Sequence, residues 1–472
     1  MTDEYDLVVI GAGSAGLSAA TFAARLGAKI ALVERYLPGG DCLYTGCVPS
    51  KTLIKVAKVA REMRRAADYG LPPCRPEVDL GQVMAHVQQV IQRVYRFEGP
   101  ETLAAEGVDL VLAPARFRDP KSIVAGERRL RAGQFLLCTG ARASVPPIPG
   151  LAETPHETYE SVFRMQQLPG RLLVLGAGPI GLEMAQAFRR LGSQVTVFQR
   201  SQRILPFADP EISTALLEVL TEEGVRFRTG SRIERVAGTP WGGVSVTASG
   251  ETIEGDALLV AAGRRPNVEE LGLEQAGVDY SAEGVPVDEH LRTNQKHIYA
   301  CGDLIGSHQF THYAAWQAYL AVRNALLPGA SNGLRVQVPW TIFTDPEVAR
   351  CGLAEQEARD RYGDQVRVAT WPLERVDRAQ AEEDRRGFIK VVHKRDGEVL
   401  GAHIMAARAG EIIHEYVLAI EQGLKFGDLS GAIHVYPTYS TGNQQIAAVY
   451  RINSLLESRT GKLVAGLARW VR

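Results

Sequence analysis

An internal repeat constrains the fold of this 472-residue chain more than any other feature. The run GAGSAGLSAATFAARLGAKIALVER, residues 11–35, aligns without gaps with GAGPIGLEMAQAFRRLGSQVTVFQR, residues 176–200. Each copy follows a short apolar strand, opens a helix with GxGxxG and ends in a second strand. Such a unit is typical of a doubly wound parallel sheet that binds a dinucleotide, so the two copies predict two dinucleotide sites.

The two copies carry the same glycines but end in different side chains. The glycines that let the backbone approach a pyrophosphate are Gly11, Gly13 and Gly16, then Gly176, Gly178 and Gly181. Glu34 ends the first copy, where a carboxylate accepts the ribose 2′-hydroxyl of an adenosine. Gln199 takes that place in the second copy, followed by Arg200 and Arg203. Two guanidinium groups without a carboxylate favour a 2′-phosphate, so the second site is expected to prefer NADPH, with NADH possible. Solvated surface arginines are the alternative interpretation.

A pair of cysteines stands in GGDCLYTGCVPSK, residues 39–51. Pro49 suits a first helical turn and helix formers follow it, so we expect a helix to begin near Cys47. The positive end of that helix, with Lys51 one turn on, lowers the thiol pKa and favours the reactive thiolate. Cys42 and Cys47 therefore predict a catalytic disulfide, with buried structural cysteines as the alternative. A structural zinc site is disfavoured because it needs four ligands.

The composition excludes several classes of partner. A net charge of −1 gives no field for attracting nucleic acid or anionic membranes, and no nucleic-acid-binding motif is present. The apolar runs have the length of strands, and acidic residues precede the first of them, so we expect no membrane span and no targeting segment. We expect a cytoplasmic protein in which only a catalytic disulfide forms among the six cysteines.

Taken in order, these motifs resemble the class I pyridine nucleotide-disulfide oxidoreductases, which include lipoamide dehydrogenase, glutathione reductase and mercuric reductase. The resemblance also includes TGA at residues 139–141, GRRPN at 263–267, CGD at 301–303 and FTDPEVARCGL at 343–353. It implies FAD in the first site, a nicotinamide nucleotide in the second, and a homodimer in which each active site borrows C-terminal residues from the partner chain.

The resemblance implies an α/β fold with two Rossmann-like domains and a C-terminal α+β domain. The Pro-rich linker SVPPIPG at residues 144–150 and the GRRPN run mark two of the expected boundaries. The expected segments are a first FAD-binding part at 1–150, an NAD(P)H-binding domain at 151–267, a returning FAD-binding part at 268–335 and a dimerisation domain at 336–472. In the last segment we predict a hairpin with an Asp-Gly turn, then one helix over AGEIIHEYVLAIEQGL.

The same resemblance assigns roles to single residues. Cys47 would face the flavin, and Cys42 would be the outer thiol that meets the substrate. Lys51 would lie at the flavin edge and pair with Glu183, which has Ser18 as its counterpart in the first copy. Other expected cofactor contacts are Thr139, Gly140, Gly263, Asp303 at the flavin ribityl chain, and Thr311 through its backbone.

The chain departs from lipoamide and glutathione reductases at HVYPTYST, residues 434–441. Tyr436 and Thr441 replace the histidine and glutamate that together protonate a leaving thiol in those enzymes. A tyrosine with a pKa near 10 protonates a thiol poorly at neutral pH. Mercuric reductases also carry a tyrosine there, and reducing a thiolate-bound metal ion needs no such proton. His434, two residues earlier, is an alternative acid.

We therefore expect electrons to pass from NADPH to FAD, then to the cysteines and to an acceptor such as Hg(II), another metal ion or a quinone. Cys42 and Cys47 would be transient ligands of a substrate ion. Thr441 and the final LARWVR, which lacks paired cysteines, differ from mercuric reductases. The alternatives are a dihydrolipoamide dehydrogenase of a 2-oxoacid dehydrogenase complex and a non-catalytic nucleotide-binding assembly protein.

Overall fold

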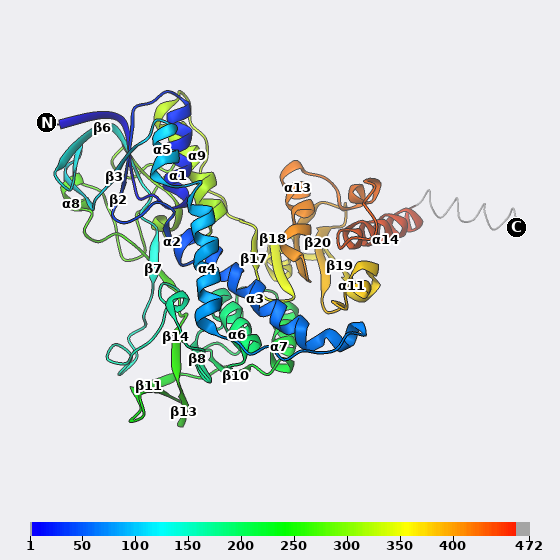
Figure 1. The fold of residues 1–472 in the computed structure, drawn as a ribbon. Helices are drawn as coiled ribbons and strands as arrows, with labels where there is room; N and C mark the ends of the chain where they lie inside the picture. Colours follow the sequence, from blue (N-terminus) through cyan, green and yellow to red (C-terminus); the bar gives the residue numbers. More distant parts are fainter. Residues whose placement is uncertain (1, 459–472) are drawn as a thin grey trace, which may run out of the picture. The chain divides into compact units, whose positions relative to one another are not determined.

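The computed structural model describes residues 2–458 and divides into two compact units (Figure 1). Met1–Arg200 and Gly224–Val336 form the first unit, and Ser201–Glu223 and Gln337–Arg472 form the second. The terminal LARWVR run lies outside the described residues. No helix within residues 2–458 is both long enough and apolar enough to cross a membrane. The predicted α/β class, with Rossmann-like sheets, is confirmed.

A seven-stranded sheet contains the first sequence repeat of unit 1. Its order is β3-β2-β1-β6-β5-β4, and β16 also pairs with β6. The strands are β1 (Thr2–Ile10), β2 (Ile30–Glu34), β3 (Asp109–Leu112), β4 (Ala115–Asp119), β5 (Ser122–Ala125), β6 (Arg128–Leu137) and β16 (Ile298–Ala300). The run LVVI, residues 7–10 of β1, is buried on both faces, as expected of a central parallel strand. Helices α1 (Ser14–Arg25) and α9 (Thr311–Leu326) lie side by side on one face (Figure 1).

The second nucleotide-binding part has a smaller parallel sheet in the order β10-β9-β8-β14. Its strands are β8 (Arg171–Leu175), β9 (Gln194–Phe198), β10 (Arg226–Arg228) and β14 (Ala257–Val260), with a separate antiparallel sheet of β11 (Ile233–Gly238), β12 (Val244–Ala248) and β13 (Glu251–Gly255). Helix α6 (Pro179–Leu191) joins β8 to β9, so β8-α6-β9 repeats β1-α1-β2.

The third glycine of each repeat lets its helix pack closely on the preceding turn. A Cβ at Gly16 would lie 1.7 Å from the Gly11 carbonyl oxygen, and one at Gly181 would lie 2.0 Å from that of Gly176. No side chain fits at either position. The glycine pattern read in the sequence is therefore also a packing requirement of the fold.

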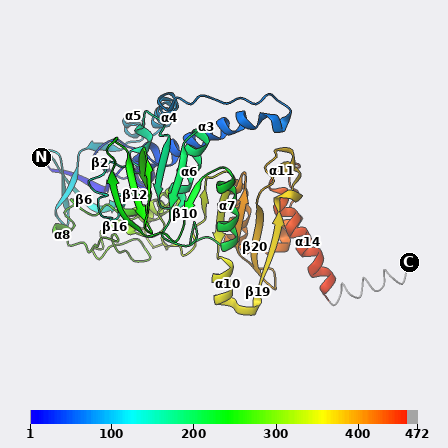
Figure 2. The ribbon, with the colours of Figure 1, turned by 90° about the horizontal axis from the view of Figure 1, so that it is seen from below.

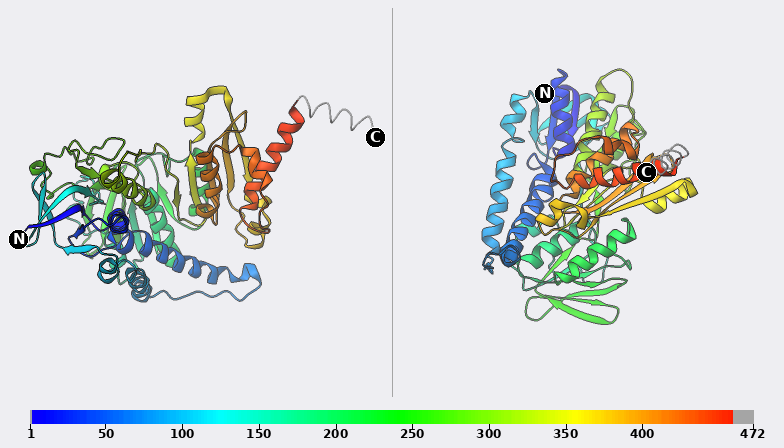
Figure 3. Two further views of the ribbon diagram at one scale, coloured as in Figure 1. Left: turned by 90° about the horizontal axis from the view of Figure 1, so that it is seen from above. Right: turned by 90° about the vertical axis from the view of Figure 1, so that its right-hand side faces the viewer.

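The cysteine motif forms two helices that meet at a tight turn. Helix α2 (Gly40–Tyr44) carries Cys42, and helix α3 (Cys47–Arg65) begins at Cys47, which confirms the predicted helix start. A Cβ at Gly46 would lie 2.8 Å from the Asp41 carbonyl oxygen, so only glycine allows this turn. Helix α3 then packs beside α4 (Leu80–Tyr95), as Figure 3 shows in its right view.

Unit 2 is built on an antiparallel sheet in the order β17-β18-β21-β20-β19. The strands are β17 (Trp340–Ile342), β18 (Glu347–Gly352), β19 (Val366–Pro372), β20 (Phe388–Lys394) and β21 (Val399–Ala406). Strands β20 and β21 pair across the predicted Asp-Gly turn, which confirms that hairpin. Helices α7 (Pro210–Glu222) and α10 (Glu355–Tyr362) lie on one face of the sheet, and α14 (Thr441–Glu457) lies on the other (Figure 2).

The predicted single helix after β21 is wrong, because the chain forms α12 (Ala409–Ile412) and α13 (His414–Gln422) with a break at Ile413. The amide of Asn443, on α14, donates a 2.9 Å hydrogen bond to the Ile412 carbonyl. The Tyr416 N–H bonds to the Ile413 carbonyl instead of to that of Ile412. The side chain of a distant helix therefore interrupts the regular hydrogen-bond ladder.

A buried lysine explains why residues 201–223 belong to unit 2. The Lys390 side chain, on β20, is 3% exposed, and its Nζ lies 3.2 Å from the Asp209 carboxylate. The same Nζ lies 2.9 Å from Glu211 and 2.7 Å from Glu355. A buried ammonium group is tolerated only when it is paired, so these contacts hold the start of α7 on the sheet.

Candidate active site

The two cysteines of α2 and α3 form a polarised thiol pair. Both are free thiols, half-buried and hydrogen-bonded to each other. The hydrogen bond from Cys42, together with those from Thr311 and the charge of Lys51, lowers the pKa of Cys47 to about 6 although burial opposes this. The same contact raises the pKa of Cys42 well above its usual range. Near neutral pH the pair therefore holds a thiolate at Cys47 and a thiol at Cys42.

An ion pair joins the cysteine helix to the second nucleotide-binding part. Lys51 Nζ, one turn after Cys47 on α3, lies 2.9 Å from Glu183 Oε2 on α6. The Glu183 side chain is 6% exposed, so its charge requires a partner at this position. The equivalent position of the first repeat is Ser18. The ammonium group is thereby placed close to the thiolate-bearing turn.

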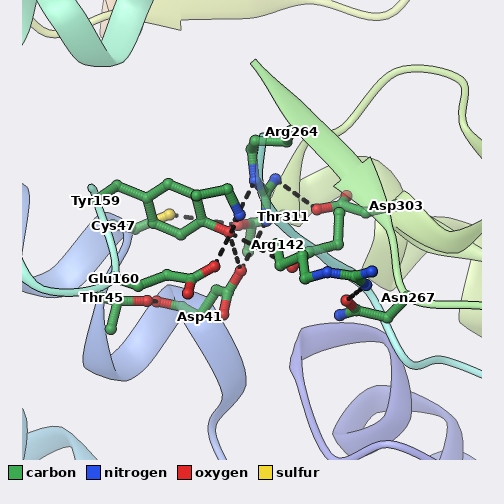
Figure 4. A network of polar contacts seen from close by, with 12 residues as sticks. Asp41, Thr45, Cys47, Arg142, Tyr159, Glu160, Arg264, Asn267, Asp303 and Thr311 are labelled. Atoms are coloured by element: carbon green, nitrogen blue, oxygen red, sulfur yellow. Dashed lines mark hydrogen bonds and ion pairs between the residues drawn. The ribbon is translucent and has the colours of Figure 1, made fainter. Parts of the chain in front are cut away.

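A buried arginine connects the cysteine segment with two other elements of unit 1 (Figure 4). Arg264 lies in β15 (Arg264–Pro266), within the GRRPN run, and its side chain is 18% exposed. Its guanidinium contacts Asp41 Oδ2 at 2.8 Å and Asp303 Oδ2 at 2.5 Å. The Tyr159 hydroxyl donates to the same oxygen of Asp41 at 2.9 Å, and the guanidinium lies 5.1 Å from the centre of the Tyr159 ring.

This network contains two carboxylates, of Asp41 and Asp303, and one guanidinium, of Arg264. The carboxylates therefore outnumber the cation by one. Desolvation raises the pKa of Asp303, while Arg264 opposes that shift. Asp41 is the residue before Cys42, and Asp303 belongs to the CGD run at the end of β16. Arg264 therefore holds the outer-thiol segment and the CGD carboxylate in one place.

Two expected cofactor elements pair directly with each other. Strand β7 (Ala141–Ala143), after the TGA run, is antiparallel to β15. The Thr139 hydroxyl donates to the Asn267 carbonyl at 2.8 Å, and the Asn267 N–H donates to the Gly140 carbonyl at 2.9 Å. Gly263 has φ +135°, and the nearest atom to a Cβ there would be 3.9 Å away, so this backbone has open space beside it.

The phosphate-binding turns fit dinucleotides. A Cβ at Gly178 would meet nothing within 4 Å, so the backbone faces open space there, whereas one at Gly13 would be in ordinary contact with the Gly40 Cα at 3.8 Å. Glu34 accepts from the Ala12 N–H at 2.8 Å. Gln199 accepts from the Ala177 N–H at 3.1 Å, so it repeats the hydrogen bond of Glu34 without the charge.

The chain's own residues thus fit FAD in the first turn and a nicotinamide nucleotide in the second. The expected 2′-phosphate ligands are divided between the units: Gln199 and Arg200 belong to unit 1, whereas Arg203 belongs to the segment of unit 2 that precedes α7. The NADPH preference therefore stays a prediction.

Tyr436, in unit 2, has a carboxylate partner that the sequence motif does not include. Its hydroxyl donates to Asp377 Oδ2 at 2.6 Å, and this contact raises the pKa of Tyr436. Its side chain is 67% exposed, between Val435 at 77% and a cis Tyr436-Pro437 bond. The phenol therefore stays protonated at neutral pH and faces outward from its own chain.

Both ring nitrogens of His434 are occupied by acceptors. Nε2 lies 2.9 Å from Glu415 Oε2, and Nδ1 lies 3.0 Å from the Ala432 carbonyl oxygen. The carbonyl oxygen can only accept, so Nδ1 donates to it, and Nε2 is held by the Glu415 carboxylate. Burial opposes the charge, but the bond to Glu415 raises the pKa of His434.

Several residues of these contacts were missed by the sequence analysis, namely Asp41, Tyr159, Arg264, Asp377 and Glu415. A signal existed for two of them, since Asp41 lies inside the cysteine motif and Arg264 inside GRRPN. Nothing in the local sequence distinguishes the other three. Their roles follow from contacts between distant segments.

Comparisons with known proteins agree on the relationship. Residues 5–318 match the family model of the pyridine nucleotide-disulphide oxidoreductases, and residues 338–446 match the dimerisation domain of that family. The mercuric reductase of Staphylococcus aureus is 36% identical over 95% of this chain and 82% of its own length. The dihydrolipoyl dehydrogenase of Thermus scotoductus is 34% identical over 94% of this chain and 96% of its own.

Solved structures show the same similarity. The HOCl-induced flavoprotein disulfide reductase RclA of Escherichia coli superposes with a TM-score of 0.86 at 29% identity, over 94% of this chain and 100% of that one. A Cu(II) complex of RclA gives a TM-score of 0.85 over 93% and 99% of the two chains.

The polarised thiol pair leads to a spectroscopic prediction. In a Cys42→Ser variant carrying FAD, the Cys47 thiolate should produce a long-wavelength thiolate-to-flavin absorbance band without any reductant. Thr311 and Lys51 still lower the pKa of Cys47 in this variant, so the band should be present at pH 8 and weaken as the pH falls. Cys47→Ser should lack the band. A Cys42→Ser protein with no band at any pH from 5 to 9 would show that the inner and outer thiols are wrongly assigned.

The Arg264 network leads to a stability prediction. Arg264→Leu leaves the Asp303 carboxylate, whose side chain is 15% exposed, without its cation and should lower the free energy of unfolding by about 3 kcal/mol. Urea unfolding of the purified protein measures this change. Asp303→Asn in the same background should recover part of the loss. Arg171→Leu breaks an ion pair whose side chains are 44% and 35% exposed, so it should cost less than about 1 kcal/mol. Equal losses in the two single variants would contradict the argument.

Proposed function

Because this chain belongs to the pyridine nucleotide-disulphide oxidoreductase family, FAD-dependent enzymes that use a pyridine nucleotide as substrate, we propose that it passes electrons from NADPH to a thiolate-bound metal ion. The favoured acceptor is Hg(II), with another soft ion or a quinone as further possibilities. The observation that carries this proposal is Tyr436, which takes the place of a histidine acid and whose hydroxyl is bonded to Asp377.

The residues of unit 1 have separate tasks in this proposal. FAD, when bound, supplies hydride acceptance from the nicotinamide and two-electron transfer to the disulfide. Gly11, Gly13 and Glu34 would hold its adenosine part, and Asp303 its ribityl chain. Lys51, held by Glu183, would place a positive charge beside the reacting edge. Cys47 would face that edge as a thiolate.

In the proposed reaction, the metal ion is bound and reduced at Cys42 and Cys47. Cys42 and Cys47 would bind a soft ion through sulfur, which suits Hg(II) or a reduced copper ion. Two electrons from one NADPH reduce one Hg(II) ion or two Cu(II) ions, and NADP⁺ and one proton are released. No thiol leaves in this reaction, so no acid is needed to protonate it. RclA is a relative whose Cu(II) complex has been solved, which supports a metal ion as the class of acceptor.

The match of residues 338–446 to the dimerisation domain supports a homodimer. We infer that Tyr436 reaches the partner's thiol pair rather than its own. Its support is exposure: Ile433 is 98% exposed and Val435 77%, so two apolar side chains beside Tyr436 lack cover from residues 2–458 of their own chain. A Tyr436 hydroxyl held by Asp377 would then contribute an oxygen ligand or a hydrogen bond at the bound ion.

His434 is a poor replacement for the missing acid. A catalytic histidine needs one nitrogen for its carboxylate partner and the other for the substrate. In this loop Glu415 and the Ala432 carbonyl take both. These contacts support a structural role in which His434 fixes the loop that carries Tyr436.

Dihydrolipoamide dehydrogenase activity is the second candidate, because a dihydrolipoyl dehydrogenase matches this chain over nearly its full length. That reaction requires proton transfer at a leaving thiol, and neither Tyr436 nor Thr441 supplies a group with a suitable pKa. We therefore rank it below metal-ion reduction.

The charges after β9 lead to a prediction of nucleotide choice. NADPH should give a higher kcat/KM than NADH in reducing the enzyme-bound flavin. Arg200→Ala with Arg203→Ala should lose about 1–3 kcal/mol per contact for NADPH and little for NADH, because only the former carries a 2′-phosphate. Gln199→Glu, which places at position 199 the carboxylate that Glu34 has in the first repeat, should favour NADH. Equal kcat/KM values for both nucleotides in the unmodified enzyme would exclude this preference.

Tyr436 leads to a prediction about the acceptor. The unmodified enzyme should reduce lipoamide and glutathione disulfide slowly while its NADPH-to-flavin half reaction stays fast. Tyr436→His with Thr441→Glu should raise disulfide turnover by up to ~100–10,000-fold, the range that a positioned acid supplies, with no rise in Hg(II) reduction. Tyr436→Phe should lower Hg(II) turnover without changing disulfide turnover. Anaerobic stopped-flow kinetics measure flavin reduction by NADPH and the reduction of each acceptor. Rapid lipoamide turnover by the unmodified enzyme would contradict this prediction and favour dihydrolipoamide dehydrogenase activity.

A further inference from the structure

Two buried cysteines outside the active site lie side by side in the first sheet of unit 1. Cys138 directly follows β6 and is 5% exposed, and Cys301 directly follows β16 and is 0% exposed. Their sulfur atoms are 3.6 Å apart, although 163 positions separate them in the sequence. The sequence analysis expected no disulfide other than that of Cys42 and Cys47. The fold therefore brings together a second thiol pair.

The sheet holds the two backbones at a separation that suits a disulfide. Strands β6 and β16 are parallel with Ala300 opposite Leu137, and the Cys301 N–H donates to the Leu137 carbonyl at 3.1 Å. Cys138 and Cys301 come next in this register and therefore lie opposite each other. Neighbouring strands are about 4.8 Å apart, and a disulfide needs a Cα–Cα distance of about 4.4–6.8 Å. The sulfur atoms need to approach by only about 1.5 Å to reach the bonding distance of about 2.05 Å.

The surroundings of the pair keep one sulfur protonated. Burial and the neighbouring Cys301 sulfur raise the pKa of Cys138 well above its usual range. Cys138 therefore stays a thiol whose S–H donates to the Cys301 sulfur. Ala15 of α1 and Ala314 of α9 belong to the same packed apolar cluster as both cysteines. The pair is thus a neutral thiol-to-thiol contact inside the core.

Both cysteines lie next to residues that are expected to contact FAD. Cys138 precedes the TGA run, and Cys301 begins the CGD run. A Cβ at Gly11 would lie 2.5 Å from the Cys138 carbonyl oxygen, so the Cys138 backbone contacts the first phosphate-binding turn. A bond between the sulfur atoms would link the two expected FAD-binding segments, 1–150 and 268–335, which are separated along the chain by the expected NAD(P)H-binding domain.

We propose that hydrogen peroxide oxidises Cys138 and Cys301 to a second disulfide, and that this bond links the two expected FAD-binding segments and strengthens FAD retention. The Cys301 sulfur attacks one peroxide oxygen and the O–O bond breaks. Cys301 becomes a sulfenic acid, and its proton leaves with the other oxygen as water. The Cys138 sulfur then attacks the Cys301 sulfur, so the sulfur–sulfur bond forms and the hydroxyl leaves with the Cys138 proton as a second water. Two thiols lose two electrons and two protons, and one peroxide becomes two waters.

Burial determines how fast this disulfide forms and how long it lasts. A neutral thiol in apolar surroundings reacts slowly, so sustained oxidation by a small uncharged molecule is required. Reduction requires a thiolate to reach one of the two sulfur atoms, and burial hinders that approach as well. The second disulfide should therefore form after that of Cys42 and Cys47 and persist longer.

The test exposes the purified FAD-loaded protein to hydrogen peroxide and then alkylates the remaining free thiols in denaturant. Peptide mass spectrometry without reductant should detect Cys138 cross-linked to Cys301, and the cross-link should disappear after reduction in denaturant. Cys351 of unit 2, a buried thiol that is 2% exposed, is the matched control in the same sample. Its peptide should stay alkylated and free of cross-links.

FAD retention gives the second measurement, followed by flavin fluorescence as the protein is titrated with urea. Oxidation of the unmodified protein should move the midpoint of FAD release upward by about 0.5–1 M urea, because the bond closes a long loop in the unfolded chain. Cys138→Ala and Cys301→Ala should each lack this shift, and Cys351→Ala should keep it. The Cys42–Cys47 disulfide forms in all four proteins, so it does not account for a difference among them.

The proposal is overturned if prolonged oxidation of the unmodified protein gives no cross-linked peptide. An equal rise of the midpoint in oxidised Cys301→Ala, or a cross-link that leaves the midpoint unchanged, would also overturn it. The cross-linking result requires no substitution, so it decides the outcome even where an alanine variant does not fold. Neither measurement depends on which acceptor the enzyme reduces.

Discussion

The paired guanidinium of Arg264 is the interaction on which the arrangement of unit 1 depends. A largely buried cation needs anionic partners, and Arg264 finds them in Asp41 and Asp303. Asp41 precedes Cys42, and Asp303 follows β16, so one side chain brings the thiol segment to the carboxyl edge of the first sheet. Gly40 makes the same approach possible sterically, because a Cβ there would lie 2.6 Å from the Gly13 Cα. The thiols are thus placed against the first phosphate-binding turn.

The two repeats share a backbone but differ in the charged side chains that they carry. Their strands, helices and glycines are equivalent, and the amide of Gln199 even repeats the hydrogen bond made by Glu34. The differences are in charge. The second copy has Gln199 where the first has Glu34, and it has Glu183, the partner of Lys51, where the first has Ser18. Packing is conserved within the chain while electrostatics diverge, because backbone geometry depends on the glycines and recognition depends on the side chains.

In unit 2, Tyr436 and His434 each have a carboxylate partner. The Tyr436 phenol donates to Asp377 and remains protonated, whereas the two ring nitrogens of His434 are occupied by Glu415 and the Ala432 carbonyl. An exposed phenol suits hydrogen bonding or coordination at a metal ion, and a histidine without a free nitrogen is not available for proton transfer. These contacts agree with the proposed reduction of an acceptor that takes no proton from the enzyme.

The sequence by itself determined the two nucleotide-binding units, the start of α3 at Cys47 and the β20-β21 hairpin. Each follows from a local pattern: glycine spacing between strand and helix, a proline in a first turn, an Asp-Gly pair between strands. Only the tertiary structure decided the partners of Arg264, the contact of Thr311 with Cys47 and the break at Ile413. Arg264 and Asp41 are 223 residues apart, Thr311 and Cys47 are 264 apart, and Asn443 reaches Ile412 from another helix. Periodicity and propensity describe neighbours along the chain, whereas these contacts arise when buried polar groups must find partners among whatever segments the fold brings together.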